Sequence, residues 1–150
     1  MNYKMKSIAL VAAVGMIGIS SCKKDDVPAK ESIVKKDLMA HTWQMEKVIE
    51  YTSGSSTVSY QRGAANNQED YSMIRQTYKS NGSITYIDQS GESGTDGIYE
   101  LLNNDTKIRI GLASMGLSVI GNNLKVDNNS FGYTINHGDG DSTRFVFSPQ

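Results

Sequence analysis

The most reactive side chain in this sequence is the thiol of Cys22, its only cysteine. A thiolate is a nucleophile, a metal ligand and a target for oxidation or alkylation. With no second cysteine an internal disulfide is excluded, although a secreted protein would permit one. Cys22 directly follows an apolar run and two small residues, so its chemistry has to be explained by that position.

The first 21 residues have the layout of a signal peptide. Two lysines precede an apolar run over residues 8–19, and Ser20 and Ser21 follow it. A run of about 12 residues fits the ~7–15 of a signal-peptide core and is short of the ~20 that a membrane-spanning helix needs. Two alternatives stay open: a buried core helix with Cys22 near its end, or a secreted protein cleaved elsewhere.

The segment Ile19-Ser20-Ser21-Cys22 resembles the lipobox of bacterial lipoproteins. The resemblance implies that residues 1–21 are removed, that the Cys22 thiol carries a diacylglycerol in thioether linkage, and that the new amino terminus is acylated. Each buried methylene contributes about 0.8 kcal/mol, and one acyl chain alone binds a membrane only reversibly. Several chains on Cys22 would therefore anchor the protein stably.

Three charged residues after the cysteine, Lys24, Asp25 and Asp26, resemble the surface-export signal of some Gram-negative lipoproteins. That resemblance implies a lipid-anchored protein of the outer membrane, on the cell surface. The alternative is that residues 22–36 form only a flexible charged tether, and that the protein faces the periplasm.

No residue pattern predicts catalysis, a metal or a cofactor. His41 and His137 lie far apart without a second ligand at metal-site spacing. The acidic turn around Asp139 lacks the regular oxygen ligands of a calcium loop, and no serine stands in a Gly-x-Ser-x-Gly motif. Glu69 and Asp70 would point to opposite faces of a strand. The formal net charge of -1 gives no field that would attract nucleic acid, so we expect neither an enzyme nor a nucleic-acid partner.

Six aromatic residues are the candidate ligand-binding set: Trp43, Tyr78, Tyr86, Tyr99, Tyr133 and Phe145. They permit two interpretations. They fill the core of a small barrel, whose interior is just wide enough to be packed by side chains. Alternatively, they line a cavity for a small hydrophobic ligand and offer tyrosine hydroxyls as polar contacts.

The elements that must position these residues are short strands. Apolar and polar residues alternate in many of them, as half-buried antiparallel strands require. Trp43 and Met45 share one phase and Val48 the other, which predicts a bulge in the first strand. One helical turn over residues 37–41, capped by Asp37, is expected before it. The predicted strands cover residues 42–51, 73–79, 83–88, 97–102, 107–111, 117–120, 124–127, 131–136 and 143–147.

Turns rich in Asn, Asp and Gly separate these strands, among them residues 80–82, 103–105, 121–123, 127–129 and 138–141. Eight or nine strands with a turn about every ten residues predict one all-β antiparallel domain over residues 37–150. Two architectures fit: an up-and-down barrel or a two-sheet sandwich.

The stretch over residues 38–48, with Trp43 at its centre, resembles the start of lipocalin-like domains found behind lipoprotein signals. Asn81-Gly82 and Gly97-Ile98-Tyr99-Glu100-Leu101 follow in the family's order, with Tyr99 where the family usually has Trp. The resemblance spans about residues 37–147 and implies the barrel.

Two functions follow as expectations. In the first, a lipocalin-like barrel anchored to the outer membrane binds a small hydrophobic ligand. In the second, a filled barrel is a structural or interaction lipoprotein, whose loops at residues 53–67 and 91–97 contact another envelope protein or a glycan.

Overall fold

The computed structural model describes residues 31–150. The predicted signal peptide, Cys22 and the export signal of Lys24, Asp25 and Asp26 lie outside this part of the chain. The elements, in chain order, are α1 (Ile33–Met39), β1 (Thr42–Thr52), β2 (Ser55–Gln61), β3 (Arg75–Tyr78), β4 (Ser83–Ile87), β5 (Ser93–Leu102), β6 (Lys107–Leu112), the 3-10 turn η1 (Ala113–Met115), β7 (Leu117–Val126), β8 (Phe131–Gly138) and β9 (Asp141–Pro149).

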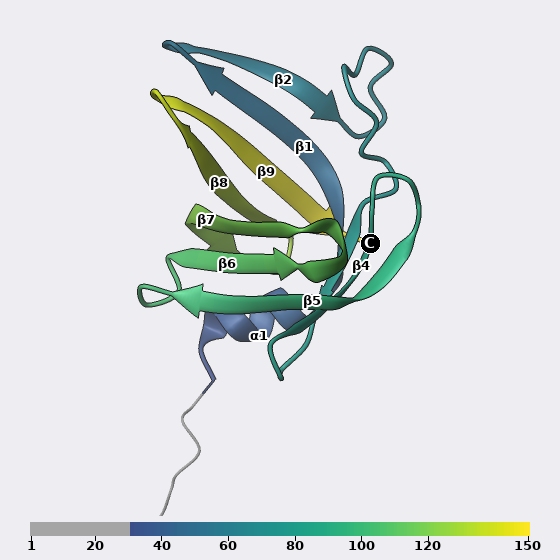
Figure 1. Cartoon of the computed structure of the whole chain (residues 1–150), viewed down its shortest axis with the longest axis vertical. Helices are drawn as coiled ribbons and strands as arrows, with labels where there is room; N and C mark the ends of the chain where they lie inside the picture. The colour runs from purple at the N-terminus through teal and green to yellow at the C-terminus, as the bar shows by residue number, and fades with distance from the viewer. Residues whose placement is uncertain (1–30) are drawn as a thin grey trace, which may run out of the picture.

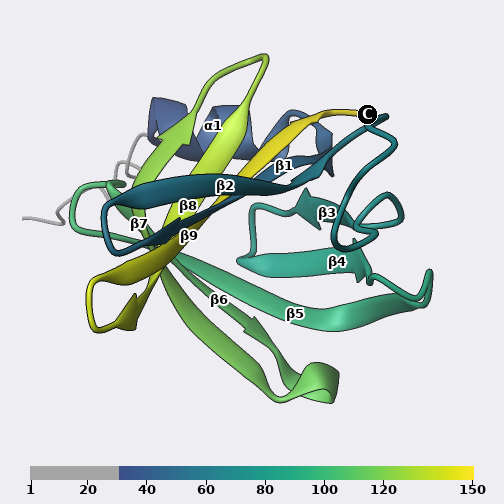
Figure 2. The same ribbon diagram turned by 90° about the horizontal axis from the view of Figure 1, so that it is seen from above.

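The strands form a closed antiparallel barrel, and the predicted all-β up-and-down architecture is confirmed. Strands β3 to β9 pair in sequence order, and β1 closes the circle by pairing with both β3 and β9. Eight strands therefore make the barrel, and β2 is an extra strand beside β1 (Figures 1 and 2). The alternative of two separate sheets is not what the structure shows.

Strand β1 has three partners because it is long and bulged. Its first three residues pair with β3, and its second half, from Lys47 on, pairs with β2. The register shifts between Met45 and Lys47 opposite β9, and between Val48 and Ile49 opposite β2, which confirms the predicted bulge. Along one side of β1, β3 pairs with the first residues and β2 with the second half. The barrel wall is therefore closed at the end where β1 meets β3 and opens toward the other end.

The helix α1 covers the closed end of the barrel (Figure 1). It begins at Ile33, capped by the Ser32 hydroxyl, and not at the predicted residues 37–41 with Asp37 as the cap. Val34 and Leu38 are one turn apart and both pack on the core, so burial fixes the longer helix. The helix thus begins within the predicted tether of residues 22–36. Among the described residues, no helix is long and apolar enough to cross a membrane.

Three strand predictions need correction. Residues 117–126 form one strand, not two, because Asn123 takes a positive φ of 51° inside a bulge and the pairing with β8 continues after it. Strand β2 falls in the segment expected to be a loop, since its first four residues are exposed and show no apolar alternation. Strand β5 begins at Ser93, four residues before its predicted start.

Candidate functional site in the open end of the barrel

Three of the six predicted site residues lie in the packed, closed end. Trp43 and Tyr78 each contact the ring of Phe131, with centroid separations of 5.7 and 5.5 Å, and Tyr78 also meets Tyr99 edge to face. Trp43 Nε1 donates to the Leu38 carbonyl over 2.7 Å.

The hydroxyl groups of the two tyrosines also have internal partners. Tyr78 donates to Gln76 Oε1 over 2.6 Å, and Tyr99 donates to the Lys79 carbonyl over 2.8 Å. Trp43, Tyr78 and Tyr99 are therefore core residues whose polar atoms are hydrogen-bonded, and none of them lines the cavity at the open end of the barrel.

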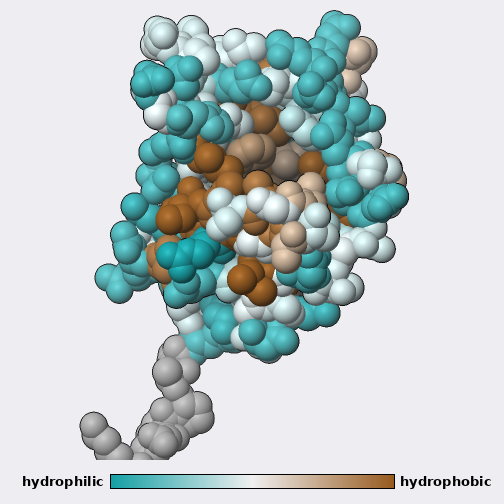
Figure 3. Space-filling view, viewed as in Figure 1, coloured by the Kyte–Doolittle hydropathy of each residue, from teal (hydrophilic) through white to brown (hydrophobic). Residues whose placement is uncertain are grey.

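The other three, Tyr86, Tyr133 and Phe145, do line a common cavity in the open end. Its volume is about 230 Å³. Figure 3 shows an apolar hollow on the face of the molecule seen in Figure 1. The remaining lining residues come from nearly every wall of the barrel: Met45, Ile74, Gln76, Ile87, Asp88, Gln89, Leu112, Met115, Leu117, Val119, Ile135 and Phe147.

The polar contacts that this cavity offers are few. Among residues 31–150, no group hydrogen-bonds the Tyr133 hydroxyl, and burial alone raises the pKa of this phenol well above its usual value. Gln76 uses its Oε1 to accept from Tyr78, which leaves the Nε2 donor for another partner. An apolar pocket with two donors can orient a ligand that carries a hydrogen-bond acceptor.

Tyr86 is tied to the rim of the cavity. Its hydroxyl donates to Asp96 Oδ1 over 2.9 Å, and the backbone N–H and hydroxyl of Ser114 in η1 also hydrogen-bond the Asp96 carboxylate. We call Tyr86, Asp96 and Ser114 the Asp96 latch. Gly94 makes it possible, because a Cβ there would lie 2.2 Å from Cζ of the Tyr86 ring. The latch fixes η1, which carries Met115, beside the cavity mouth.

The charge at the mouth is negative. Among residues 31–150, Asp88 is the lining residue that carries charge, and no Lys, Arg or His of this part of the chain lines the cavity. The Ser90 hydroxyl, followed by the Glu92 backbone N–H, stabilises the Asp88 carboxylate and lowers its pKa. A carboxylate ligand would therefore enter an apolar cavity past a like charge and find no cation there.

Several residues that line the cavity were not predicted to be site residues, although the sequence pattern indicates that they face inward. Leu112, Ile135 and Phe147 continue the inward phase of strands that were predicted to be half-buried. Gln76 is a polar residue in the inward phase between Ile74 and Tyr78, and such an interruption of an apolar face marks a polar group inside the barrel.

Other predicted features of the described chain carry no comparable site. The turn around Asp139 is the tip of the β8–β9 hairpin, and no three His, Cys, Asp or Glu side chains among residues 31–150 lie close enough to share a metal ion. His137 Nε2 lies 2.8 Å from the Thr143 hydroxyl in the same hairpin.

The fold itself, a small eight-stranded antiparallel barrel with one extra strand, is consistent with a lipocalin-like architecture. The chain matches no protein-family model, no curated protein and no solved structure.

Proposed function

We propose that this chain is a lipoprotein of the outer membrane whose barrel binds a small, neutral, mostly apolar ligand in its open end. The observation that carries the proposal is the cavity lined by Tyr86, Tyr133 and Phe145. At about 230 Å³ it is larger than a cavity of about 150 Å³ that holds benzene, and smaller than the roughly 300 Å³ at which drug-sized pockets begin. A compact ligand, or one whose tail leaves through the mouth, fits this volume.

The chemistry of the wall narrows the ligand further. The Tyr133 hydroxyl and the Gln76 amide both donate, so the ligand has an acceptor such as a carbonyl, ether or hydroxyl oxygen. The Asp88 carboxylate lines the cavity and no cation of the described chain does, so a neutral head group is favoured over a carboxylate. An alcohol or ester of moderate length suits the site better than a fatty acid.

The location in the proposal depends on the amino-terminal sequence. Lipid on Cys22 would anchor the barrel, and Lys24, Asp25 and Asp26 would direct it to the cell surface. A Cys22→Ser variant is expected to lose palmitate labelling and to leave the membrane fraction. If it stayed membrane-bound, the anchor would lie elsewhere. Whole-cell protease accessibility of the unmodified protein distinguishes the cell surface from the periplasmic face.

Ligand binding is tested by isothermal titration of the purified chain with three ligands of the same chain length: 1-octanol, octanoate and octylamine. We expect saturable binding of octanol at one site and weaker binding of octanoate. Native mass spectrometry with a broad panel of lipids and small molecules extends the search. Absence of saturable binding in both experiments would refute a ligand-binding barrel, and a preference for octanoate would refute the neutral head group.

A further inference from the structure

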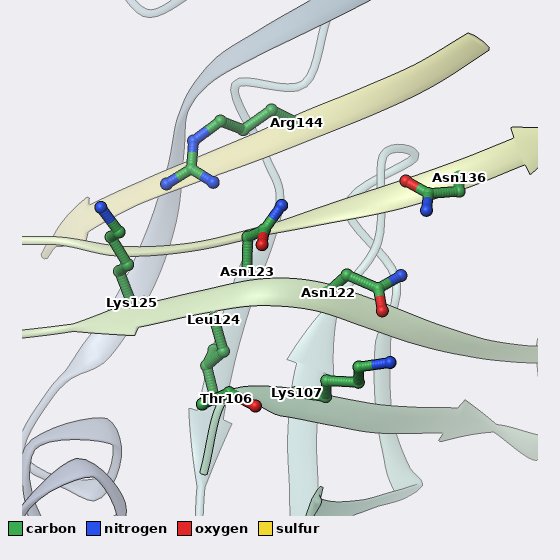
Figure 4. A pocket seen from close by; sticks show the side chains of 8 residues that line it. All are labelled: Thr106, Lys107, Asn122, Asn123, Leu124, Lys125, Asn136 and Arg144. Carbon is green, nitrogen blue, oxygen red and sulfur yellow. The ribbon is translucent and has the colours of Figure 1, made fainter. Parts of the chain in front are cut away.

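A second hollow lies on the outer face of the barrel, away from the cavity. We propose that it binds an acidic carbohydrate, a sugar chain that bears carboxylate or phosphate groups. The hollow has a volume of about 860 Å³, and its lining, shown in Figure 4, is Thr106, Lys107, Asn122, Asn123, Leu124, Lys125, Asn136 and Arg144.

Strand register builds this hollow from β7, β8 and β9. Asn122 pairs with Thr134, and Thr134 pairs with Arg144, so these three residues form a row across neighbouring strands. Their inward neighbours include Tyr133 and Phe145 of the cavity, so the row faces outward. Lys107 stands on β6 directly before Ile108, which pairs with Gly121 beside Asn122. The row thus continues to a fourth strand.

The bulge in β7 and a glycine in β8 bring two cations together. Lys125 pairs with Gly132 after the bulge. A Cβ at Gly132 would lie 3.3 Å from Nη2 of Arg144, so the guanidinium extends over the position that a side chain would occupy. In Figure 4, the ends of Arg144 and Lys125 point toward each other, with Asn123 beside them. Lys107 lies in the other half of the hollow, near Asn122 and Asn136.

These cations have no acidic partner in the described chain. The ion pairs of residues 31–150 involve Lys35, Arg62 and Arg109, and no Asp or Glu lines the hollow. Two like charges that approach each other without a counter-charge repel, and their repulsion is relieved when an anion binds between them. A cation cluster on a chain whose formal net charge is -1 is a local feature, so it points to a local anionic partner.

The neutral lining residues identify the kind of anion. Asn122, Asn123 and Asn136 present amides that both donate to and accept from hydroxyl groups, as sugar rings require. None of the described aromatic side chains lines the hollow, so the hollow does not offer the stacking platform of a single-stranded nucleic-acid site.

This inference is independent of ligand binding in the cavity. The two sites are on opposite sides of the barrel wall and share none of their lining residues. The hollow also differs from the segments 53–67 and 91–97, in which the sequence placed a possible glycan contact. Either site can therefore exist without the other.

The test is isothermal titration of the full chain with hexagalacturonate and with its methyl ester, which keeps the sugar chain and removes its charge. We expect saturable binding of the acid and at least tenfold weaker binding of the ester. Arg144→Gln and Lys125→Gln should each weaken binding of the acid several-fold, and the double variant at least tenfold. Lys79→Gln, in the exposed β3–β4 turn, changes the charge equally and should bind as the unmodified chain does.

Each other result would overturn the proposal. If hexagalacturonate does not bind, the hollow is not a carbohydrate site. If Lys79→Gln weakens binding as much as Arg144→Gln and Lys125→Gln do, the binding depends on the overall charge of the chain and not on this hollow. Unchanged binding by the double variant places the carbohydrate elsewhere. Binding of inorganic phosphate, single-stranded DNA or vesicles containing anionic lipid, without binding of hexagalacturonate, identifies a different class of ligand. Thermal unfolding of every variant, which should occur at the unmodified temperature because these residues are outside the core, separates binding defects from misfolding.

Discussion

The two ends of this barrel are built from the same kinds of residue and do different things. At the closed end, α1 covers the interior, and Trp43, Tyr78 and Phe131 are almost completely buried. At the open end, Tyr86, Tyr133 and Phe145 surround a void. Both sets alternate inward along their strands, so the difference comes from what covers them.

The hydrogen bonding of the aromatic side chains also differs between the two ends. Trp43 and Tyr78 donate to groups inside the closed end. Tyr86 donates to the rim, and Tyr133 has no partner among the described residues. A satisfied polar atom stabilises the fold, whereas an unsatisfied one in a cavity is available to a ligand. This comparison predicts that substitutions at the closed end change stability, and that substitutions at the open end change binding.

The largest effect is expected for Trp43→Ala at the closed end. The substitution leaves a large void between Leu38 and Phe131 and removes the hydrogen bond to the Leu38 carbonyl. We expect the free energy of unfolding to fall by about 3–5 kcal/mol, as for other buried large aromatic residues. Urea denaturation followed by circular dichroism measures it. A loss below about 1 kcal/mol would mean that the closed end is not the stability centre.

A smaller loss is expected for Gly94→Ala, which sharpens the boundary between the two ends. The new Cβ would lie 2.2 Å from Cζ of Tyr86, so the ring has to move and the Asp96 latch is broken. We expect a loss of about 1–3 kcal/mol, typical of overpacking. Gly111→Ala in β6 is the matched reference, because Gly111 is also a strand glycine without a left-handed φ, and a Cβ there would lie 3.2 Å from Ile98, an exposed side chain that can move. Equal losses in both variants would show that the contact with Tyr86 costs nothing.

Tyr133→Phe at the open end should change binding without changing stability. The substitution removes one hydroxyl that has no partner in the described chain and keeps the ring that packs on Phe147. One hydrogen bond to the ligand is worth about 0.5–1.5 kcal/mol, so the affinity for 1-octanol should fall roughly two- to tenfold. Tyr78→Phe is the matched control. It should be less stable than the unmodified chain, because Gln76 Oε1 is left unpaired, and its affinity for 1-octanol should fall less than that of Tyr133→Phe. The reverse pattern would exchange the roles of the two ends.

The smallest effect is the pH response of the Asp96 latch. Hydrogen bonds from the Ser114 backbone N–H and the Tyr86 hydroxyl lower the pKa of Asp96 below its ordinary 3.8. Because the pKa of Asp96 is lower in the folded state than its ordinary 3.8, the hydrogen bonds of the latch stabilise the fold fully above pH 3.8. This stabilisation is lost as the pH falls through the folded-state pKa. The amide resonance of Ser114 should therefore be constant from pH 7 to 5 and should shift below pH 3.8. Asp96→Asn should abolish this shift, and its persistence would assign the titration to another group.

Much of the fold could be predicted from the sequence because local alternation encodes it. Ile108 and Ile110, and likewise Phe145 and Phe147, share a phase that specifies which face is inward. Strand β2 could not be predicted in the same way, since it is an edge strand with one exposed half and gains its structure from pairing with β1. Tertiary pairing supplied what local sequence lacked.

The candidate site could be predicted only in part. Alternation indicates that Tyr78 and Tyr86 both face inward, and nothing local distinguishes them. Their different environments arise because α1 covers one end of the barrel and β2 displaces β3 along β1. Whether an inward aromatic residue packs or lines a void is a property of the closed fold.

The central claim is that the open end is a binding cavity, and blocking it tests that claim most directly. Val119→Phe places a larger side chain into the void, and Val58→Phe makes the same change on the exposed face of β2. Titration of each variant with a neutral hydrophobic fluorescent probe should show one saturable site in the unmodified chain and in Val58→Phe, and none in Val119→Phe at an unchanged melting temperature. Equal binding by all three proteins would contradict the account, because the probe would then bind outside the cavity.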